Sequence, residues 1–440
     1  MSSFKMLTTF AVFCLYSLLI PPISASPPPA DSYWKVSPPI DVNDRLYAGQ
    51  PQLPATHKLI YNASQVGRTY AHHTMLRAVG NTVYLIHSTA AVDEDQQSEE
   101  TWTSVSNDGG ETWSETRVLL PQALLPNQTS PEDYIYWCER KVWQRAIAPD
   151  SIVEVDGEVY GVGQTAVFMC PDGKNNFRKG AGRIARVIDR YGRPSGGACW
   201  VTKNNWTDEV QFDKTVYGQE WGMQWCKHAR EIEAILDDPP EIPMDSDYLY
   251  NNDFFAIDGK HEMEEVTHGL WIKDRSVRPY GGYWQRFWRD GSDEDLFTGR
   301  VWVEYAYDKL GRDWYPKKPE SHKIYETNIP DRGSKQYLGR LGNGDRYLVH
   351  NPRYNASCFS QCDREPLVVS MSRGSDLSYR SAGVVRTNAS SHKIPGMSKN
   401  PGFSYPSAVE VDGRLLVGYS ENKENIWLTL VDVDNLPGCD

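Results

Sequence analysis

The sequence predicts an all-β protein folded as a β-propeller of six or seven blades. Three observations support this fold class. Helical patterning is scarce, a strand–turn–strand unit recurs along the chain, and one segment has the sequence of a specialised turn between strands.

Only one short segment, residues 228–236, has the spacing of an amphipathic helix. Most of the remaining chain consists of short runs rich in Val, Ile, Tyr and Trp, separated by Gly, Asp and Asn. Such runs are typical of strands joined by tight turns.

The recurring unit is a short strand, a tight turn containing Gly or Asn, and a second strand. Asp-Gly and Asn-Gly turns suit hairpins because these residues tolerate positive φ angles. The copies lie at residues 75–87, 151–163, 253–265, 283–291, 337–350 and 407–419. Radially arranged hairpins of this kind predict six or seven small antiparallel sheets. A β-sandwich is the alternative, although sandwiches rarely reach this length.

The specialised turn lies at residues 106–113, which follow the pattern S-x-D-x-G-x-T-W. We expect Asp108 to cap backbone amides of the turn and Trp113 to pack between strands. Residues 308–314 resemble a diverged copy with one extra residue. This motif predicts structural support for the outer part of a blade and no catalytic role.

Residues 1–25 predict a signal peptide. Lys5 precedes an apolar run, Leu7–Ile20, and small residues follow it. The run is too short to cross a bilayer, which needs about 20 apolar residues. We therefore expect a secreted, extracellular protein, with residues 26–440 forming a single propeller domain because no long linker interrupts them.

Sequons for N-glycosylation support secretion and predict surface loops. They begin at Asn62, Asn127, Asn205, Asn355 and Asn388.

The cysteine pattern predicts disulfides but does not determine their pairing. Cys14 lies in the leader, and an odd number remains, so at least one cysteine stays unpaired in a monomer. Cys358 and Cys362 could close a short loop. No cluster of Cys and His has zinc-ligand spacing, so we expect no metal site of that kind.

The formal net charge of −12 and the lack of Lys/Arg blocks argue against nucleic acid and anionic membranes as partners. We expect a monomer whose anion-binding groups are local arginines and lysines.

The S-x-D-x-G-x-T-W segment resembles the Asp-box of sialidase-like propellers. Residues 327–352, 363–372 and 402–436 also resemble this family, and the likeness covers most of residues 70–436. It implies a carbohydrate-directed propeller, since the family includes sialidases, polysaccharide lyases and inactive binders. Within the family, the whole sequence is most similar to fungal-type lyases that release L-rhamnose from rhamnosyl-glucuronate ends.

In sialidase-like propellers the substrate pocket lies where the innermost strands begin. When the hairpins are aligned on their turns, His73, Gln336 and Tyr405 occupy this position, and His72 and Lys335 adjoin them. We predict catalytic roles for His72, His73 and Tyr405, because an imidazole can take and return a proton near neutral pH.

Cationic, amide and aromatic side chains are predicted to bind the substrate. A guanidinium group can bind a carboxylate through two parallel hydrogen bonds, and an indole ring can stack on a sugar. The predicted binding residues are Arg77, Arg140, Arg145, Arg289, Lys335, Gln336, Asn252 and Trp137.

The sequence favours a lyase that removes the C5 proton of a uronate, with arginines stabilising the enolate-like state. This chemistry requires no metal, and the sequence neither indicates nor excludes calcium in the tunnel. A sialidase-like hydrolase is the first alternative, with Asp93, Glu94 or Asp95 as acid, but the expected Phe/Tyr-Arg-Ile-Pro segment is missing. A non-catalytic glycan-binding propeller is the second alternative.

Overall fold

The computed structural model describes residues 29–438, except 92, 95–98, 122–143, 170–176, 204–223, 238–254, 257–259, 278, 313, 315–323, 356–362 and 397–398. The predicted signal peptide therefore lies outside the described residues. None of the described helices is long and apolar enough to span a membrane.

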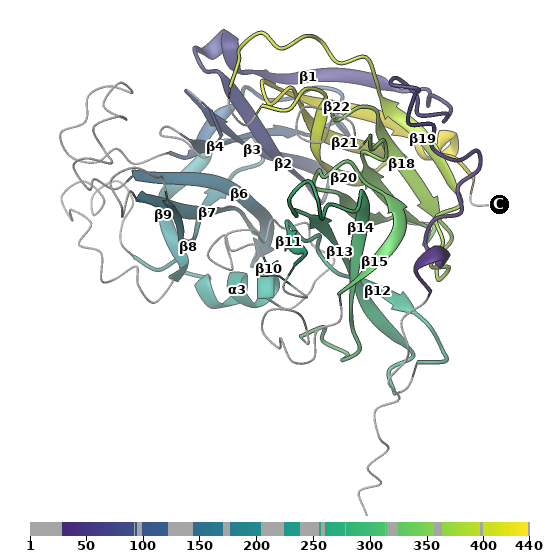
Figure 1. Ribbon diagram of the computed structural model, residues 1–440. Helices are drawn as coiled ribbons and strands as arrows, with labels where there is room; N and C mark the ends of the chain where they lie inside the picture. Colours follow the sequence, from purple (N-terminus) through teal and green to yellow (C-terminus); the bar gives the residue numbers. More distant parts are fainter. Residues whose placement is uncertain are drawn as a thin grey trace, which may run out of the picture.

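The described strands form five antiparallel sheets arranged as the blades of a propeller (Figure 1). Blade 1 contains β2 (Tyr70–Val79), β3 (Thr82–Ala90), β4 (Glu100–Ser106) and β5 (Arg117–Leu120). Blade 2 contains β6 (Gln144–Val155), β7 (Glu158–Met169), β8 (Phe177–Ile188) and β9 (Pro194–Lys203). Blade 3 contains β10 (Phe255–Ala256), β11 (Glu262–Glu264), β12 (Leu270–Lys273), β13 (Gly282–Asp290), β14 (Arg300–Ala306) and β15 (Ile324–Pro330).

Blade 4 contains β16 (Tyr337–Arg340), β17 (Arg346–His350), β18 (Leu367–Ser372) and β19 (Ser381–Arg386). Blade 5 contains β20 (Phe403–Val411), β21 (Arg414–Glu421), β22 (Asn425–Asp432) and the N-terminal strand β1 (Thr56–Asn62). Because β1 pairs with β22, the beginning and the end of the described chain share one blade, which closes the ring.

The all-β prediction is confirmed, but the prediction of six or seven blades is wrong, because the structure has five. The reason is that two of the six sequence hairpins belong to the same sheet. Residues 253–265 contribute β10 and β11, whereas residues 283–291 are mostly the single strand β13, which pairs with β11.

Four short helices complete the described elements: η1 (Ala30–Ser32), η2 (Ala63–Val66), α3 (Ala229–Asp237) and η6 (Val433–Asn435). Helix α3 confirms the one helix predicted from sequence. A disulfide joins Cys199 on β9 to Cys226, three residues before α3. Cys358 and Cys362 lie outside the described residues.

Apolar side chains between neighbouring blades form the core. Ile86 and Leu119 of blade 1 pack in one cluster with Ile152 of blade 2, and Leu76 of blade 1 packs in another with Leu416 of blade 5. Burying each such side chain contributes about 1.5–3 kcal/mol, so the blades stabilise one another across their faces.

The predicted turn at residues 106–113 joins β4 to β5, the third and fourth strands of blade 1. The Asp108 carboxylate accepts hydrogen bonds from Thr112 N (2.9 Å), Thr112 Oγ1 (2.5 Å) and Ser106 Oγ (2.7 Å). These bonds lower the pKa of Asp108 to about 2. Trp113 packs against the apolar cluster between blades 1 and 5, so the structural role is confirmed.

Aspartates cap the equivalent loop in three further blades. The diverged copy is one of them, since Asp308 accepts hydrogen bonds from the backbone amides of Leu310 and Arg312. The other two are Asp189 between β8 and β9 and Asp376 between β18 and β19. A single carboxylate therefore orders the turn between the third and fourth strands in four blades.

Replacing Asp108 with Ala should lower the free energy of unfolding by about 1 kcal/mol, because the turn loses hydrogen bonds that are largely exposed to solvent. Chemical denaturation measures this change. The neighbouring Glu115→Ala variant is the control and should stay within about 0.5 kcal/mol of the parent protein. Equal stability of the Asp108→Ala variant and the parent would contradict the capping role.

Candidate functional site

The inner edges of three blades are interrupted at corresponding places. His73, Glu265 and Tyr405 have φ angles of 50°, 51° and 52°, in the left-handed region that residues other than glycine seldom adopt. The pairing register of β2 shifts between His72 and Met75, and that of β20 shifts between Ser404 and Ser407. Glu265 directly follows β11, and both β11 and β12 pair with β13.

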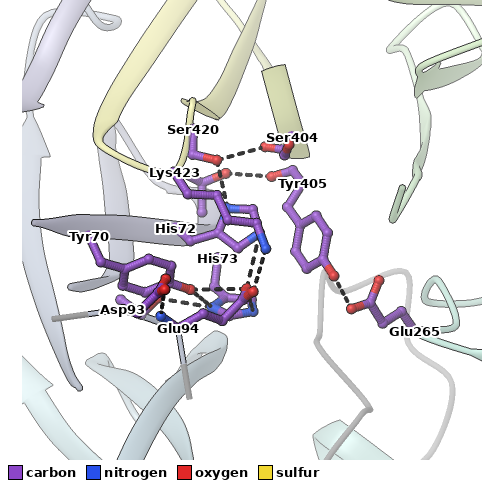
Figure 2. A network of polar contacts seen from close by, with 12 residues as sticks. Tyr70, His72, His73, Asp93, Glu94, Glu265, Ser404, Tyr405, Ser420 and Lys423 are labelled. Carbon is purple, nitrogen blue, oxygen red and sulfur yellow. Dashed lines mark hydrogen bonds and ion pairs between the residues drawn. The ribbon is translucent and has the colours of Figure 1, made fainter. Parts of the chain in front are cut away.

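These interruptions bring side chains together. In a regular strand His72 and His73 would point to opposite faces, but here their ring centroids are only 4.6 Å apart. The Tyr405 ring lies 4.1 Å from the His72 ring and 5.3 Å from the His73 ring. Figure 2 shows Tyr405 between the histidines and Glu265.

Tyr405 and Glu265 form a buried hydrogen-bonded pair with Arg289. The Tyr405 hydroxyl donates to Glu265 Oε1, and Arg289 Nη1 donates to Glu265 Oε2 (2.7 Å) and to the Tyr405 oxygen (3.0 Å). Burial opposes ionisation of Glu265, but the charge and hydrogen bond of Arg289, the hydrogen bond from Tyr405 and the charge of Lys335 together outweigh it and lower the Glu265 pKa to about 2. Burial and the Glu265 charge raise the pKa of Tyr405. At neutral pH the pair therefore consists of an ionised carboxylate that accepts a hydrogen bond from a neutral phenol.

Three arginines line a small cavity beside this pair. Arg289, Arg332 and Arg364 border a space of about 150 Å³ together with Phe297 and Asn400. Arg364 also lies 5.5 Å from the centre of the Tyr405 ring. Burial and the charge of Arg364 lower the pKa of Arg332 to about 10, and burial and Arg289 lower that of Arg364. The buried Asp290 also lines the cavity. Three guanidinium groups against one carboxylate leave an excess of positive charge among the lining side chains, an arrangement that favours a bound anion.

The opposite side of Tyr405 is formed by histidines and Glu94. His72 Nε2 lies 3.6 Å and His73 Nε2 lies 3.8 Å from Glu94 Oε1, and Lys423 donates a hydrogen bond to Glu94 Oε2. His73 Nδ1 lies 3.7 Å from Glu99 Oε1. Burial, followed by the charge of Lys423, places the pKa of His72 well below its ordinary value.

The structure brings together four of the predicted residues: His72, His73, Tyr405 and Arg289. Lys335 belongs with them, because it is buried and its charge acts on both Glu265 and His72. Of the three predicted acids, Glu94 lies in this group, Asp93 is buried beside Gly396, and Asp95 lies outside the described residues.

One predicted binding residue, Arg77, lies in another part of the fold, whereas Gln336 lies near the arginine cavity. Arg77 donates a hydrogen bond to Ile152 O and lines a different cavity with His268 and Arg340. The reason is distance along β2: four residues beyond His73 correspond to about 13 Å of extended strand. Gln336 is buried beside Asp331.

The remaining predicted residues are not tested. Trp137, Arg140 and Asn252 lie outside the described residues, and so do the sequons at Asn127 and Asn205. Arg145 lies on β6, but its side chain is not described. Asn388 is exposed, whereas Asn62 and Asn355 are half-buried.

Sequence reasoning missed Glu265, Arg332, Arg364 and Lys423. The hairpin at 253–265, which contains Glu265, was recognised in the sequence. The alignment of hairpins counted back from the turn, however, and so led to Asn251 and to its neighbour Asn252, one of the predicted binding residues. The equivalent position instead follows the turn, at the end of β11. Arg364 and Lys423 lie in loops between strands, which an alignment of hairpins does not cover.

Comparison with known proteins supports the fold. The family model described as "Beta-prop_BT_1020-like, N-terminal beta propeller" matches residues 53–238. A solved structure titled "Sialidase" superposes with a TM-score of 0.62 at 18% identity, covering 92% of this chain and 35% of its own. This chain thus spans about a third of that protein. The fold is that of the sialidase-like propellers.

A second solved structure matches nearly its full length. It is a protein of unknown function from Dyadobacter fermentans DSM 18053, with a TM-score of 0.50, 13% identity, and coverage of 87% of this chain and 99% of its own. A search of curated protein sequences found no match. At these identities the structural comparisons establish the fold alone.

Asp331, next to the arginine cavity, should make stability depend on pH. Burial raises its folded-state pKa from 3.8 to about 6, so the fold loses stability as the pH rises from about 4 to about 6, where the unfolded chain ionises before the folded one. Asp331→Asn should therefore be more stable than the parent at pH 8, by up to about 3 kcal/mol, and the advantage should disappear below about pH 4. Thermal denaturation across this pH range measures the difference.

The Asp434→Asn variant, at an exposed aspartate, provides the control for the substitution itself. An Asp331→Asn variant that is equally stable at pH 4 and pH 8, relative to the parent, would contradict the assigned burial cost.

Proposed function

We propose that this protein is a glycoside hydrolase for an acidic sugar, with Tyr405 as nucleophile and Glu265 as the base that activates it. The observation that carries this proposal is the buried Tyr405–Glu265 hydrogen bond beside a cavity lined by three arginines. The predicted leader and sequons support an extracellular setting.

The arginine cavity supports a carboxylate-bearing sugar. A planar guanidinium offers two parallel donors that match a carboxylate, and three such groups converge here. Arg289 already forms an ion pair with Glu265, and its Nη1 atom also lies 3.1 Å from Glu264 Oε1. Arg332 and Arg364 therefore contribute most of the positive charge available to a ligand.

The geometry supports covalent catalysis. As the Tyr405 oxygen bonds to the anomeric carbon, its proton passes along the existing hydrogen bond to Glu265, and the bond to the leaving oxygen breaks. Water then attacks the same carbon and gives up one proton to the group formed by His72, His73 and Glu94, which has by then protonated the leaving oxygen. The bond between the tyrosine oxygen and the carbon breaks, and Glu265 returns its proton to that oxygen. A phenol suits a sugar with an adjacent carboxylate, because a carboxylate nucleophile would be repelled by the substrate charge.

The leaving oxygen needs a proton from the other side of Tyr405. His72, His73 and Glu94 form that side, and the close approach of the Tyr405 ring to both imidazoles places it next to the nucleophile. We assign proton delivery to this wall of the site.

A lyase acting on rhamnosyl-glucuronate is the second candidate, and the observation that favours it is the presence of both histidines in the same site. An imidazole could remove the C5 proton while the arginines neutralise the carboxylate. The Tyr405–Glu265 pair favours hydrolysis, because a phenol that donates to a carboxylate is already arranged as a nucleophile with its base. A non-catalytic binder would explain the cavity without using that pair.

Product analysis on sialylated and arabinogalactan-type glycans separates these candidates. Hydrolysis predicts a saturated acidic monosaccharide, whereas elimination predicts free rhamnose and an unsaturated uronate that absorbs ultraviolet light. Tyr405→Phe and Glu265→Gln should each reduce the hydrolytic kcat by about 10²–10⁴-fold. An unsaturated product, or full activity in both variants, would overturn the proposal.

The arginine cavity makes a separate prediction about specificity. Arg332→Gln and Arg364→Gln should each raise KM for the acidic glycoside by about 10–100-fold, since each loses a charge-assisted hydrogen bond of about 1.5–3 kcal/mol. The uncharged amide of the same substrate should be affected far less. Arg77→Gln, at the other cavity, is the control and should leave KM for the acidic glycoside unchanged. Equal effects on acid and amide would argue against carboxylate binding here.

A further inference from the structure

We propose that His72, His73 and Glu94 bind one divalent transition-metal ion of the zinc class, through the two Nε2 atoms and Glu94 Oε1. This site goes beyond the proposed hydrolase reaction, and it was not expected from the sequence. The reason is that Glu94 comes from the loop after β3, so no local Cys/His spacing could indicate it.

The three atoms have nearly the spacing that a tetrahedral ion requires. Zinc–nitrogen and zinc–oxygen distances of about 2.0–2.2 Å place neighbouring ligand atoms roughly 3.4 Å apart. Glu94 Oε1 lies 3.6 Å from His72 Nε2 and 3.8 Å from His73 Nε2, and all the ligand atoms lie within 4.8 Å of one another. The two distances to Glu94 therefore exceed the tetrahedral spacing by a few tenths of an ångström, and the two imidazole nitrogens, at up to 4.8 Å, would have to approach each other by up to about 1.4 Å to complete the geometry.

Hydrogen bonding indicates that His72 presents a lone pair to this site. Ser420 Oγ donates to Ser404 O (3.4 Å), so it accepts from His72 Nδ1 (2.6 Å), and the proton of the neutral ring lies on Nδ1. His72 Nε2 is fully buried and makes no hydrogen bond. It nevertheless faces a carboxylate oxygen. A lone pair on His72 Nε2 and a carboxylate oxygen of Glu94 repel each other when they are buried, and a cation bound between them would stabilise both.

The surroundings match those of metal-binding histidines, whose second nitrogen is held by a hydrogen bond. His72 Nδ1 bonds to Ser420, and His73 Nδ1 bonds to Ser88 Oγ (2.9 Å). The Tyr70 hydroxyl donates to Glu94 Oε1 (3.2 Å) and orients the carboxylate. Figure 2 shows Tyr70, both histidines and Glu94 of blade 1 beside Ser420 and Lys423 of blade 5.

The backbone conformation has a cost that a ligand site would explain. A φ of 50° at His73 is an unfavourable backbone conformation for a residue with a side chain, and it directs both imidazoles to the same side. Three protein ligands leave a fourth position open on a tetrahedral ion. A water molecule held there would supply the proton that the proposed hydrolysis needs.

Lys423 should weaken metal binding at this site by charge repulsion. Its ammonium donates to Glu94 Oε2, and its positive charge opposes a dication at Oε1. Removing the charge of Lys423 should therefore tighten metal binding. If the cluster does not bind a metal, removing this charge will not make it bind one. This opposition gives the proposal a test with two directions.

The test measures binding of Zn²⁺ by calorimetry and of Co²⁺ by visible absorption, using chelator-treated protein without substrate. We expect one ion per chain. Glu94→Gln and His73→Gln should each weaken binding by at least about 100-fold, and Lys423→Met should tighten it by about tenfold or more. His57→Gln, on β1 outside the cluster, is the control and should bind like the parent.

The proposal is overturned if neither ion binds stoichiometrically, or if Glu94→Gln and Lys423→Met both leave the affinity unchanged. Glu94 is partly exposed, so its variant decides the matter if His73→Gln does not fold. Because binding is measured without substrate, the outcome is independent of whether the protein proves to be a hydrolase.

Discussion

The site depends on a backbone constraint. Three residues other than glycine, His73, Glu265 and Tyr405, are held at left-handed φ angles at the places where the inner strands are interrupted. A regular strand would alternate its side chains between the two faces of each blade. The interruptions instead direct the groups of blades 1, 3 and 5 toward one another. The strained conformations persist because the flanking strands are paired and packed between neighbouring blades.

Charge balance determines how these groups can act. Glu265 is buried, yet Arg289 keeps it ionised, and the carboxylate in turn holds the Tyr405 hydroxyl. Arg332 and Arg364 lie beside this pair, where burial makes their charge costly. A ligand carboxylate would relieve that cost, so in the proposed function the architecture that positions the nucleophile would also favour an acidic substrate.

The sequence predicted the all-β fold, the helix at α3 and the capping turn at Asp108, because each leaves a local pattern. It also predicted His72, His73 and Tyr405, since these lie at a fixed distance before their turns. It failed for Glu265, whose strand is interrupted so that the side chain follows the turn instead. It also predicted Arg77 as a binding residue, and strand spacing carries this residue to another cavity. The predicted number of blades was wrong because two hairpins belong to one sheet. Which strands pair across the fold is a tertiary property that the local sequence of a hairpin does not reveal.

The most direct test of the account is to react the protein with a fluorinated acidic glycoside that slows breakdown of a glycosyl-enzyme intermediate, and then to map the labelled peptide by mass spectrometry. The account predicts a single covalent adduct on the Tyr405 oxygen, absent in Tyr405→Phe. Turnover of an acidic glycan with no adduct and with an unsaturated sugar as product would contradict it.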